Sequence, residues 1–464
     1  MATPIRIGYD RGTLLLTGLG REEPFDPALW TWDERVSAWR CEAIHYSDIR
    51  ERLEKRFGRR FHDDLPVMPR ISWPAVALPP LRTEQSDATA AWKSASGRGQ
   101  VIMPTGTGKT EVALAIMAEK ATSTLVVAPV RDLMYQWHRR ILRGLGYDAG
   151  IVGDALFNIK PVTVTTYDSA TIHMAELGSQ FGLVIFDEVH HLPGQWRREA
   201  AILCAAPLRL GLTATPERTD GLHKDLDRLI GPVVYRMKFS EARGKRLADY
   251  EVVRIPVALM PEEERLYEKA ALAVQTFILE RQKEKKGYNW QDLCGESGRD
   301  PGARKALKAF FFRKAIEDRA AEKLRVLEDI FRLHPGERVM VFAGSNAMAL
   351  DVSRRFLVPT ILSHTRKKER LAVLEGFAAG RFPVLVANQV LDEGVDVPAA
   401  KVAVVIGGLG STRQATQRLG RILRKSGNSA ATLYEVVTAN TREEDRSRKR
   451  RKSDAYERTR HRRL

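Results

Sequence analysis

The sequence predicts an α/β protein with two parallel-sheet domains in tandem, a small N-terminal α+β domain and a helical insertion. Its 464 residues exceed one ordinary core, because a domain usually has about 100–200 residues. Two blocks alternate helical patterns with short strands that are apolar along their whole length, which indicates parallel sheets covered on both faces. Between these blocks, residues 262–330 are charged, helical in pattern and free of predicted strands.

Residues 1–75 form the first predicted unit, and the proline-rich stretch Pro66–Pro80 indicates a linker at its end. Arg11–Gly18 indicates a turn and a short strand, and a helix is expected from about Tyr46 to Phe57. Aromatic side chains of this unit could stack on exposed bases, but small domains more often bury them. We therefore expect core positions for Trp30, Trp32 and Trp39.

The first parallel-sheet domain is expected at residues 76–240, and a connector with the helical insertion at residues 241–330. The second parallel-sheet domain is expected at residues 331–440. Residues 441–464 are basic and poor in apolar groups, which predicts a disordered tail. The predicted strands are Gln100–Met103, Thr124–Ala128, Val162–Thr165, Leu183–Phe186 and Leu208–Thr213 in the first domain, and Arg338–Phe342, Val384–Ala387 and Val402–Ile406 in the second.

The net charge of +17 and the pI of about 9.8 favour a polyanionic partner, since Lys and Arg neutralise phosphates and release their counterions. Most of this excess lies before residue 441, so the basicity is not confined to the tail. Within the tail, Arg446–Lys452 could hold nucleic acid without reading its sequence, or could resemble a localisation signal.

Cysteine usage and hydropathy indicate the compartment. Cys41, Cys204 and Cys294 lie far apart and form neither a disulfide framework nor a metal-ligand spacing. This predicts a reducing, intracellular setting, cytoplasmic and nucleoid-associated if the chain is prokaryotic. The sequence contains no run of about 18 apolar residues, so no membrane span is predicted. The N-terminal residues have no apolar signal core.

A phosphate-binding loop is predicted from Met103 to Thr110. The segment Met-Pro-Thr-Gly-Thr-Gly-Lys-Thr follows a predicted strand and precedes the helical pattern Glu111–Lys120, which is the setting that a P-loop needs. Glycines let backbone N–H groups surround phosphates, and the helix N-terminus favours anions. Lys109 would reach the β- and γ-phosphates of ATP, and Thr110 would bind Mg²⁺. The predicted nucleotide-binding residues of the loop are Thr105, Gly106, Thr107, Gly108, Lys109 and Thr110.

Two carboxylates end another predicted strand. Asp187 and Glu188 follow the apolar run Leu183–Phe186, which is a Walker B arrangement when it accompanies a P-loop. Asp187 would hold Mg²⁺, directly or through water, and Glu188 would polarise the attacking water. His190 is expected to sense the nucleotide or couple it to movement, because no Cys or further His supplies a metal-ligand spacing.

Arginines of the second block are candidates for the other wall of the ATP site. The segment Gln417–Arg424 follows the acidic loop Asp392–Asp396, and its arginines at 421 and 424 can share one helix face. A positive face at the γ-phosphate would neutralise charge that develops in the transition state, which is the arginine-finger role. The predicted residues of this wall are Gln417, Arg421, Arg424, Gly394 and Asp396.

Together these motifs resemble those of superfamily-two helicases, in complete order over residues 81–425. Met103, in place of the first glycine of the strict P-loop pattern, is typical of the helicase variant of the loop. Leu81-Arg-Thr-Glu-Gln85 is similar to the adenine-reading Q-motif, so Arg82 and Gln85 are assigned to the nucleotide. The resemblance implies two RecA-like domains that hydrolyse ATP in the cleft between them. The other similar motifs are Ala128–Arg131, Thr165–Tyr167, Thr213–Thr215, Val341–Ala343, Ser363–Thr365 and Asp392–Asp396.

Within the superfamily the chain resembles the XPB family in its shorter archaeal and bacterial form. The segments Asp187–Pro193 and Gln417–Arg424 have the residues that are typical of that family. Tyr9–Leu15, with the tryptophans after it, is similar to the family's N-terminal damage-recognition domain, and the helical segment lies where the family carries a thumb-like insertion. The family's Arg-Glu-Asp element is Arg218-Thr219-Asp220 in this chain, and the missing middle acid bears on strand separation rather than on ATP hydrolysis.

The resemblance implies an ATP- and Mg²⁺-dependent DNA helicase or translocase of 3′–5′ polarity that acts in nucleotide excision repair. It implies a monomeric motor on single-stranded DNA, a fork or a bubble, with a possible nuclease partner. A restriction or defence translocase, an RNA helicase and a non-motor DNA-binding scaffold with a vestigial ATP site stay open as alternatives.

Phe310–Phe312 are expected to be mainly core, with one exposed. The predicted nucleic-acid contacts are Arg131, Thr166, Arg218, Asp220, His364 and Arg313.

Overall fold

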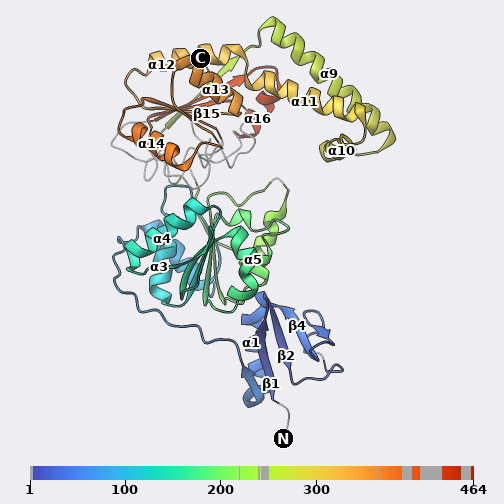
Figure 1. Cartoon of the computed structure of the whole chain (residues 1–464), viewed down its shortest axis with the longest axis vertical. Helices are drawn as coiled ribbons and strands as arrows, with labels where there is room; N and C mark the ends of the chain where they lie inside the picture. The colour runs from blue at the N-terminus through green and yellow to red at the C-terminus, as the bar shows by residue number, and fades with distance from the viewer. Residues whose placement is uncertain are drawn as a thin grey trace. The chain divides into compact units, whose positions relative to one another are not determined.

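The computed structural model of the chain describes residues 4–23, 25–218, 220–238, 241, 250–362, 364–388, 400–407, 431–450 and 461–463. These residues form two compact units, of which the first ends at Lys238. The predicted α/β class is confirmed (Figure 1): the first unit holds a small mixed sheet and a mainly parallel sheet, and the second holds a parallel sheet with a helical insertion. Among the described residues, no helix is long and apolar enough to cross a bilayer.

The N-terminal sheet has the strand order β3-β4-β2-β1-β5, in which β5 is parallel to β1 and the other pairs are antiparallel. Gly12, with φ of +96°, lies in the two-residue turn between β1 and β2, which needs left-handed backbone. Trp30 and Trp39 are buried as expected, whereas Trp32 is only half-buried. The elements are β1 Ile5–Asp10, β2 Thr13–Thr17, β3 Thr31–Asp33, β4 Ala38–Glu42, α1 Tyr46–Phe57 and β5 Phe61–Asp63.

The larger sheet of the first unit has the order β13-β6-β12-β11-β7-β10-β8-β9 and is parallel except for the pair β8–β9. Figure 1 shows α3 and α4 on one face of this sheet and α5 on the other, so its apolar strands are covered on both sides, as predicted. All five predicted strands are present within two residues of their expected bounds. The strands are β6 Arg98–Ile102, β7 Thr124–Ala128, β8 Gly150–Gly153, β9 Leu156–Asn158, β10 Val162–Thr166, β11 Leu183–Asp187, β12 Leu208–Thr213 and β13 Val233–Arg236, and the helices are α2 Thr83–Ser94, α3 Lys109–Lys120, α4 Arg131–Leu145, α5 Tyr167–Leu177, α6 Glu199–Ile202 and α7 Leu226–Leu229.

Tyr9 ties the N-terminal sheet to the parallel sheet of the same unit. Its hydroxyl lies 2.9 Å from the carbonyl oxygen of Met174 and 2.9 Å from that of Leu203. Burial raises the pKa of Tyr9, so the phenol stays a hydrogen-bond donor at neutral pH.

The second unit contains a parallel sheet of order β16-β17-β15-β18-β19-β14-β20. This domain begins before the expected start at residue 331, because β14 already belongs to its sheet and pairs with β19 along its whole length. The helical segment is therefore an insertion between β14 and β15 of one domain. Helix α12, which follows the insertion, packs on the sheet through Leu327 and Ile330. The elements are β14 Tyr250–Val257, α12 Ala321–Leu333, β15 Val339–Ala343, α13 Asn346–Phe356, β16 Thr360–Ile361, α14 Lys367–Ala378, β17 Val384–Ala387, β18 Val402–Ile406, β19 Ala431–Thr438, α16 Arg442–Arg450 and β20 His461–Arg463.

The insertion is a helical hairpin of α9 (Pro261–Glu284) and α11 (Pro301–Asp318), with α10 (Trp290–Glu296) near its tip (Figure 1). Phe311 and Phe312 are 55% and 49% exposed, so the expectation of two packed phenylalanines is wrong. The reason is helical phase: α11 buries Ala303 and Ala306, and only Phe310 follows on that face.

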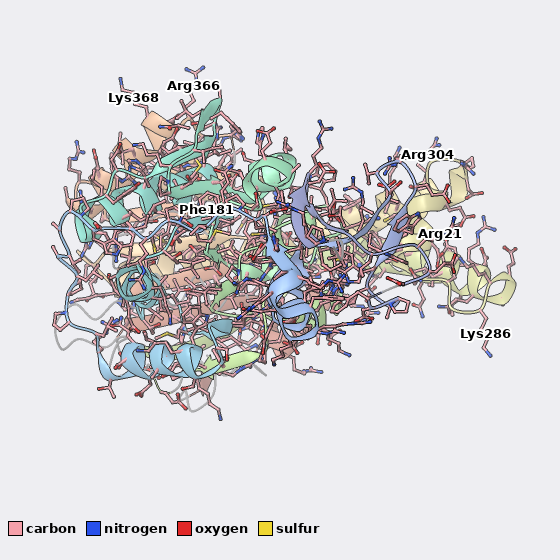
Figure 2. The ribbon with its side chains drawn as sticks, turned by 90° about the horizontal axis from the view of Figure 1, so that it is seen from below. Arg21, Phe181, Lys286, Arg304, Arg366 and Lys368 are labelled. Carbon is pink, nitrogen blue, oxygen red and sulfur yellow. The ribbon has the colours of Figure 1, made fainter. Side chains whose placement is uncertain are left out.

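Figure 2 contrasts the interior with the solvent-facing side chains. Phe181 lies in the core of the first unit, where it is fully buried. Lys286 and Arg304 of the insertion point outward into solvent.

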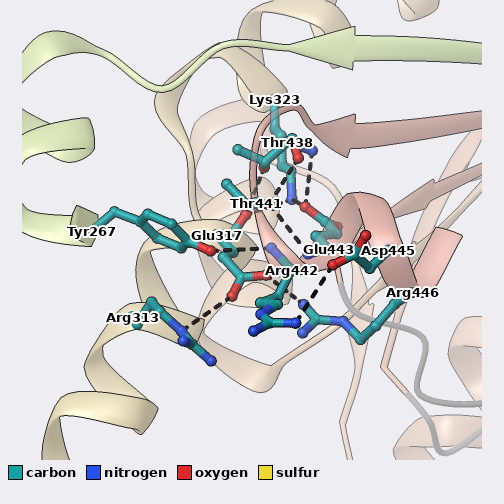
Figure 3. Close-up of polar contacts among 10 residues, drawn as sticks. All are labelled: Tyr267, Arg313, Glu317, Lys323, Thr438, Thr441, Arg442, Glu443, Asp445 and Arg446. Carbon is teal, nitrogen blue, oxygen red and sulfur yellow. Dashed lines mark hydrogen bonds and ion pairs between the residues drawn. The ribbon is translucent and has the colours of Figure 1, made fainter. Parts of the chain in front are cut away.

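Residues 442–450 form helix α16 rather than the start of a disordered tail. Figure 3 shows the polar contacts that hold it. The Lys323 ammonium lies 2.7 Å from the Glu443 carboxylate, and both side chains are almost completely buried. Arg446 pairs with Glu317 at 2.7 Å. The composition suggested disorder because apolar residues are scarce, but buried ion pairs take their place.

Candidate nucleotide and nucleic-acid site

The predicted phosphate loop connects the end of β6 to the start of α3. Gly106 and Gly108 have φ of +86° and +90°, a left-handed backbone that glycine adopts without strain. A Cβ on Gly108 would come within 2.2 Å of the side-chain nitrogen of Gln85. The Thr107 hydroxyl closes the loop by donating to the Pro104 carbonyl at 2.7 Å. The loop thus has the tight backbone that phosphate binding requires.

Arg82 and Gln85 contact the apex of this loop. The Gln85 side-chain amide donates to the Thr107 carbonyl at 3.1 Å, and the Arg82 guanidinium donates to the same oxygen. Gln85 also accepts the backbone N–H of Arg82 at 3.0 Å, which fixes both residues at the N-terminus of α2. The structure therefore brings the residues predicted for the adenine against the phosphate loop.

Lys109 and the carboxylates of β11 share one electrostatic environment. The Lys109 ammonium donates to the Met103 carbonyl at 3.0 Å, and its charge lowers the pKa of Asp187. Burial, followed by repulsion from the Glu188 carboxylate, outweighs this effect and raises the pKa of Asp187 to about 6. Glu188 itself has φ of +48°, a strained backbone of the kind found at functional positions.

Two aromatic residues hold Asp187 in place. The Trp137 indole N–H donates to one carboxylate oxygen at 2.8 Å, and the Glu188 backbone N–H donates to the other at 3.0 Å. The Tyr167 hydroxyl donates to the backbone carbonyl of Asp187 at 3.0 Å. Neither aromatic contact is predictable from the sequence, because a tryptophan on an amphipathic helix and a tyrosine at a helix start indicate packing alone.

The donor set suits Mg²⁺. Thr110 offers a hydroxyl next to Lys109, and Asp187 offers a carboxylate, which are the hard oxygen ligands that Mg²⁺ prefers. The described part of the chain contains no group of three or more His, Cys, Asp or Glu that could hold a metal ion. One or two protein oxygens are enough for Mg²⁺ when phosphates and water complete its shell.

The Thr213 hydroxyl joins the end of β12 to the acidic motif. It lies 2.9 Å from Nδ1 of His190 and 3.5 Å from a carboxylate oxygen of Glu188, and it accepts the backbone N–H of Thr215 at 3.2 Å. The Arg218 guanidinium donates to the His190 carbonyl at 2.8 Å. The structure thus links the predicted coupling residues in one chain of contacts, from Glu188 to Arg218.

The residues predicted to contact nucleic acid lie in different settings. Arg131 is exposed and paired with Asp154, and Thr166 caps α5 by accepting the N–H of Ser169 at 3.3 Å. Asp220 is exposed and forms an ion pair with Arg218, whose charge lowers the pKa of Asp220 to about 2.

The two predicted contacts of the second unit differ in exposure. His364 is exposed in a turn. Arg313 is only 12% exposed and lies 3.9 Å from the buried Glu317 carboxylate, a placement that suits a structural ion pair. Other expected residues lie outside the described part of the chain, namely Thr219, Ser363, Asp392–Asp396 with Gly394 and Asp396, and Gln417–Arg424 with Gln417, Arg421 and Arg424.

Family profiles match three parts of the chain. The profile described as "Xeroderma pigmentosum group B helicase damage recognition domain" matches residues 7–64. "Type III restriction enzyme, res subunit" matches residues 78–218, and "Helicase conserved C-terminal domain" matches residues 322–426.

Relatives over most of the chain carry XPB names. The DNA 3′-5′ translocase XPB2 of Sulfurisphaera tokodaii is 39% identical over 94% of this chain and 98% of its own length. The DNA 3′-5′ helicase XPB of Kineococcus radiotolerans is 32% identical, and that of Mycobacterium tuberculosis is 31% identical. This chain spans 61% and 58% of these two longer relatives.

Solved structures support the architecture. The structure of S. cerevisiae Dbp5 bound to RNA and ADP BeF3 aligns with a TM-score of 0.56 over 82% of this chain and 89% of that chain, at 14% identity. At such low identity, the alignment supports only the two-domain RecA-like fold. From the damage-recognition profile and the extent and identity of its relatives, the chain belongs to the XPB family of superfamily-two helicases, which are ATP-dependent enzymes.

Proposed function

We propose that the chain is an ATP-dependent 3′–5′ DNA helicase or translocase that acts in nucleotide excision repair. The observation that carries the proposal is the convergence of separate motifs on one ATP site in the first unit. The phosphate loop is contacted by Arg82 and Gln85, and the Thr213 hydroxyl contacts the acidic motif that holds Asp187 and Glu188. A vestigial site would have no need of such complete polar contacts.

Each group has a specific task in the proposed hydrolysis. Lys109 would exchange the Met103 carbonyl for the β- and γ-phosphates, and Thr110 and Asp187 would hold Mg²⁺. When bound, Mg²⁺ supplies positive charge that neutralises the phosphate oxygens. Glu188, buried beside Asp187, orients the attacking water and accepts its proton. Arg421 and Arg424 remain the proposed arginine fingers.

The contacts of Thr213 support coupling between hydrolysis and movement. On loss of the γ-phosphate, a movement of the Glu188 side chain would be passed to His190 through the Thr213 hydroxyl. It would then be passed from the His190 carbonyl to Arg218. Arg218 and Asp220 form the element that the family places at the DNA, so this chain of contacts gives a physical route between the two sites.

The proposed DNA substrate and the proposed role in repair rest on the relatives. The names of these relatives are DNA 3′-5′ translocase and DNA 3′-5′ helicase, and the N-terminal profile is named for damage recognition. The high net positive charge agrees with a polyanionic track. A DNA substrate also agrees with a location inside the cell, at the chromosome.

A titration of ATP turnover with single-stranded DNA, duplex DNA and RNA tests the proposal. We expect DNA to raise turnover of the full chain. Stimulation by RNA alone would indicate an RNA helicase, and turnover that no nucleic acid changes would leave a plain nucleotidase or scaffold. Tighter binding to duplexes with a bubble or bulky lesion than to intact duplex would support the repair role, and equal binding would oppose it.

A further inference from the structure

Helix α4 makes polar contacts with three different parts of the site. At its N-terminal turn, Arg131 and Tyr135 both contact Asp154, the latter by a hydroxyl that donates at 2.9 Å. In its middle, the Trp137 indole donates to Asp187. Farther along, Arg140 pairs with Glu111 of α3. Glu111 directly follows Thr110, so α4 touches both segments that carry the expected Mg²⁺ ligands.

We propose that Trp137 is a positioning residue for the Mg²⁺ ligand Asp187, and that α4 transmits the presence of DNA at Arg131 to that ligand. The inference rests on the proposed function and deepens it, because it names the route by which DNA would regulate ATP hydrolysis. Trp137 contacts the carboxylate of Asp187 and would act through it.

The hydrogen bond from Trp137 is suited to this task. Its donor is neutral and its acceptor is an anion, a pairing stronger than one between two neutral groups. Trp137 is 2% exposed and Asp187 is 8% exposed, so water cannot easily replace the indole. The bond occupies one carboxylate oxygen and thereby fixes the direction of the other. Partners of this kind typically change metal affinity by about 10- to 100-fold when removed.

The N-terminal turn of α4 gives DNA access to the same helix. Arg131 is exposed, and its guanidinium is already paired with the Asp154 carboxylate. A DNA phosphate at Arg131 would compete with Asp154 for this cation, so binding would alter one of the polar contacts that hold α4. Met134, Trp137 and Ile141 are buried on one face of α4, and a shift of the helix would therefore move the indole with it.

Trp137→Phe tests the inference, because it keeps a buried ring and removes the N–H. Two quantities are measured on the full chain, with and without saturating single-stranded DNA: the Mg²⁺ concentration for half-maximal ATP turnover, and the affinity for a fluorescent non-hydrolysable ATP analogue with Mg²⁺ and with EDTA. We expect about 10- to 100-fold more Mg²⁺ at half-maximum, unchanged affinity in EDTA, and loss of the DNA-induced change in the Mg²⁺ half-point.

Trp92→Phe is the matched control. Its indole is fully buried on α2 and donates at 2.9 Å to the Arg209 carbonyl, away from the ATP site. This variant should keep the wild-type Mg²⁺ half-point and DNA response. If Trp137→Phe behaves like Trp92→Phe, positioning by Trp137 is refuted. If its half-point rises but the DNA response persists, transmission through α4 is refuted.

Asp154→Asn gives a second test at the surface, in case the core variant is unstable. It weakens the pairing with Arg131 that DNA would displace and leaves the Trp137 contact in place, so the half-point without DNA should move toward the value that the wild-type chain shows with DNA, and DNA should change it less. An unchanged DNA response would refute transmission. If DNA fails to stimulate the wild-type chain, the proposed function fails, but the DNA-free comparison of Trp137→Phe with Trp92→Phe still decides the positioning role.

Discussion

Replacement of Lys323 by methionine should destabilise the second RecA-like domain strongly. The Lys323 ammonium is fully buried and pairs with Glu443 of α16, whose side chain is 1% exposed. It also donates to the backbone carbonyl of Glu317 at 2.7 Å. That carbonyl keeps another donor in the variant, the Thr438 hydroxyl at 2.9 Å, so the main consequence falls on Glu443.

The magnitude follows from the charge that is left behind. In Lys323→Met the Glu443 carboxylate stays buried and retains the Thr438 backbone N–H at 2.9 Å. An uncompensated buried charge costs about 3–5 kcal/mol. Because 1.4 kcal/mol corresponds to a factor of ten, amides that exchange only when the domain opens should exchange about 150- to 4,000-fold faster.

Hydrogen exchange on peptides of α11, β19 and α16 in the full chain measures this effect. Lys323→Met combined with Glu443→Gln removes the stranded charge and keeps an acceptor for Thr438, so most of the protection should return. Lys308→Met, at an exposed position of α11, should change the free energy of unfolding by no more than about 0.5 kcal/mol. Wild-type exchange rates in Lys323→Met would refute the docking of α16 by buried ion pairs.

Three further outcomes are expected. Lys109→Ala should abolish ATP turnover while DNA binding persists in a gel-shift titration, and turnover at the wild-type rate would remove Lys109 from the site. Arg209→Met should lower the free energy of unfolding of the first unit by at least about 3 kcal/mol, because the buried guanidinium donates to four backbone carbonyls, of which only that of Ala201 keeps a backbone donor; thermal unfolding measures the loss, and an unchanged melting temperature would contradict it. Tyr9→Phe should loosen the N-terminal sheet from the parallel sheet by about 1–3 kcal/mol, which limited proteolysis near the linker would detect as faster cleavage.

The ATP site was accessible to sequence reasoning because its chemistry restricts residue types and spacing. Lys109, Asp187 and Glu188 each follow an apolar strand at its carboxyl end, where the loops of a parallel sheet gather. Trp137 was not predictable in its polar role, since an aromatic residue on an amphipathic helix indicates packing and carries no sign of its hydrogen-bond partner.

The domain limits of the second unit were less accessible. β14 was missed because Arg254 interrupts its apolar run and because the insertion separates it from the other strands; in the structure Arg254 pairs with Glu444 of α16 at 2.9 Å. Composition predicted disorder for residues 442–450 because their acids and bases look solvated. Their partners, such as Lys323, lie more than a hundred residues away, and no local pattern reveals such pairs.

ATP-dependent displacement of streptavidin from biotinylated DNA tests the central claim most directly, because it reports movement along DNA without requiring strand separation. The account predicts that the full chain, given ATP and Mg²⁺, displaces streptavidin from the 5′ end of a single strand faster than from the 3′ end, and that Lys109→Ala displaces it from neither. Displacement from neither end by the wild-type chain, or equal displacement by Lys109→Ala, would contradict the account.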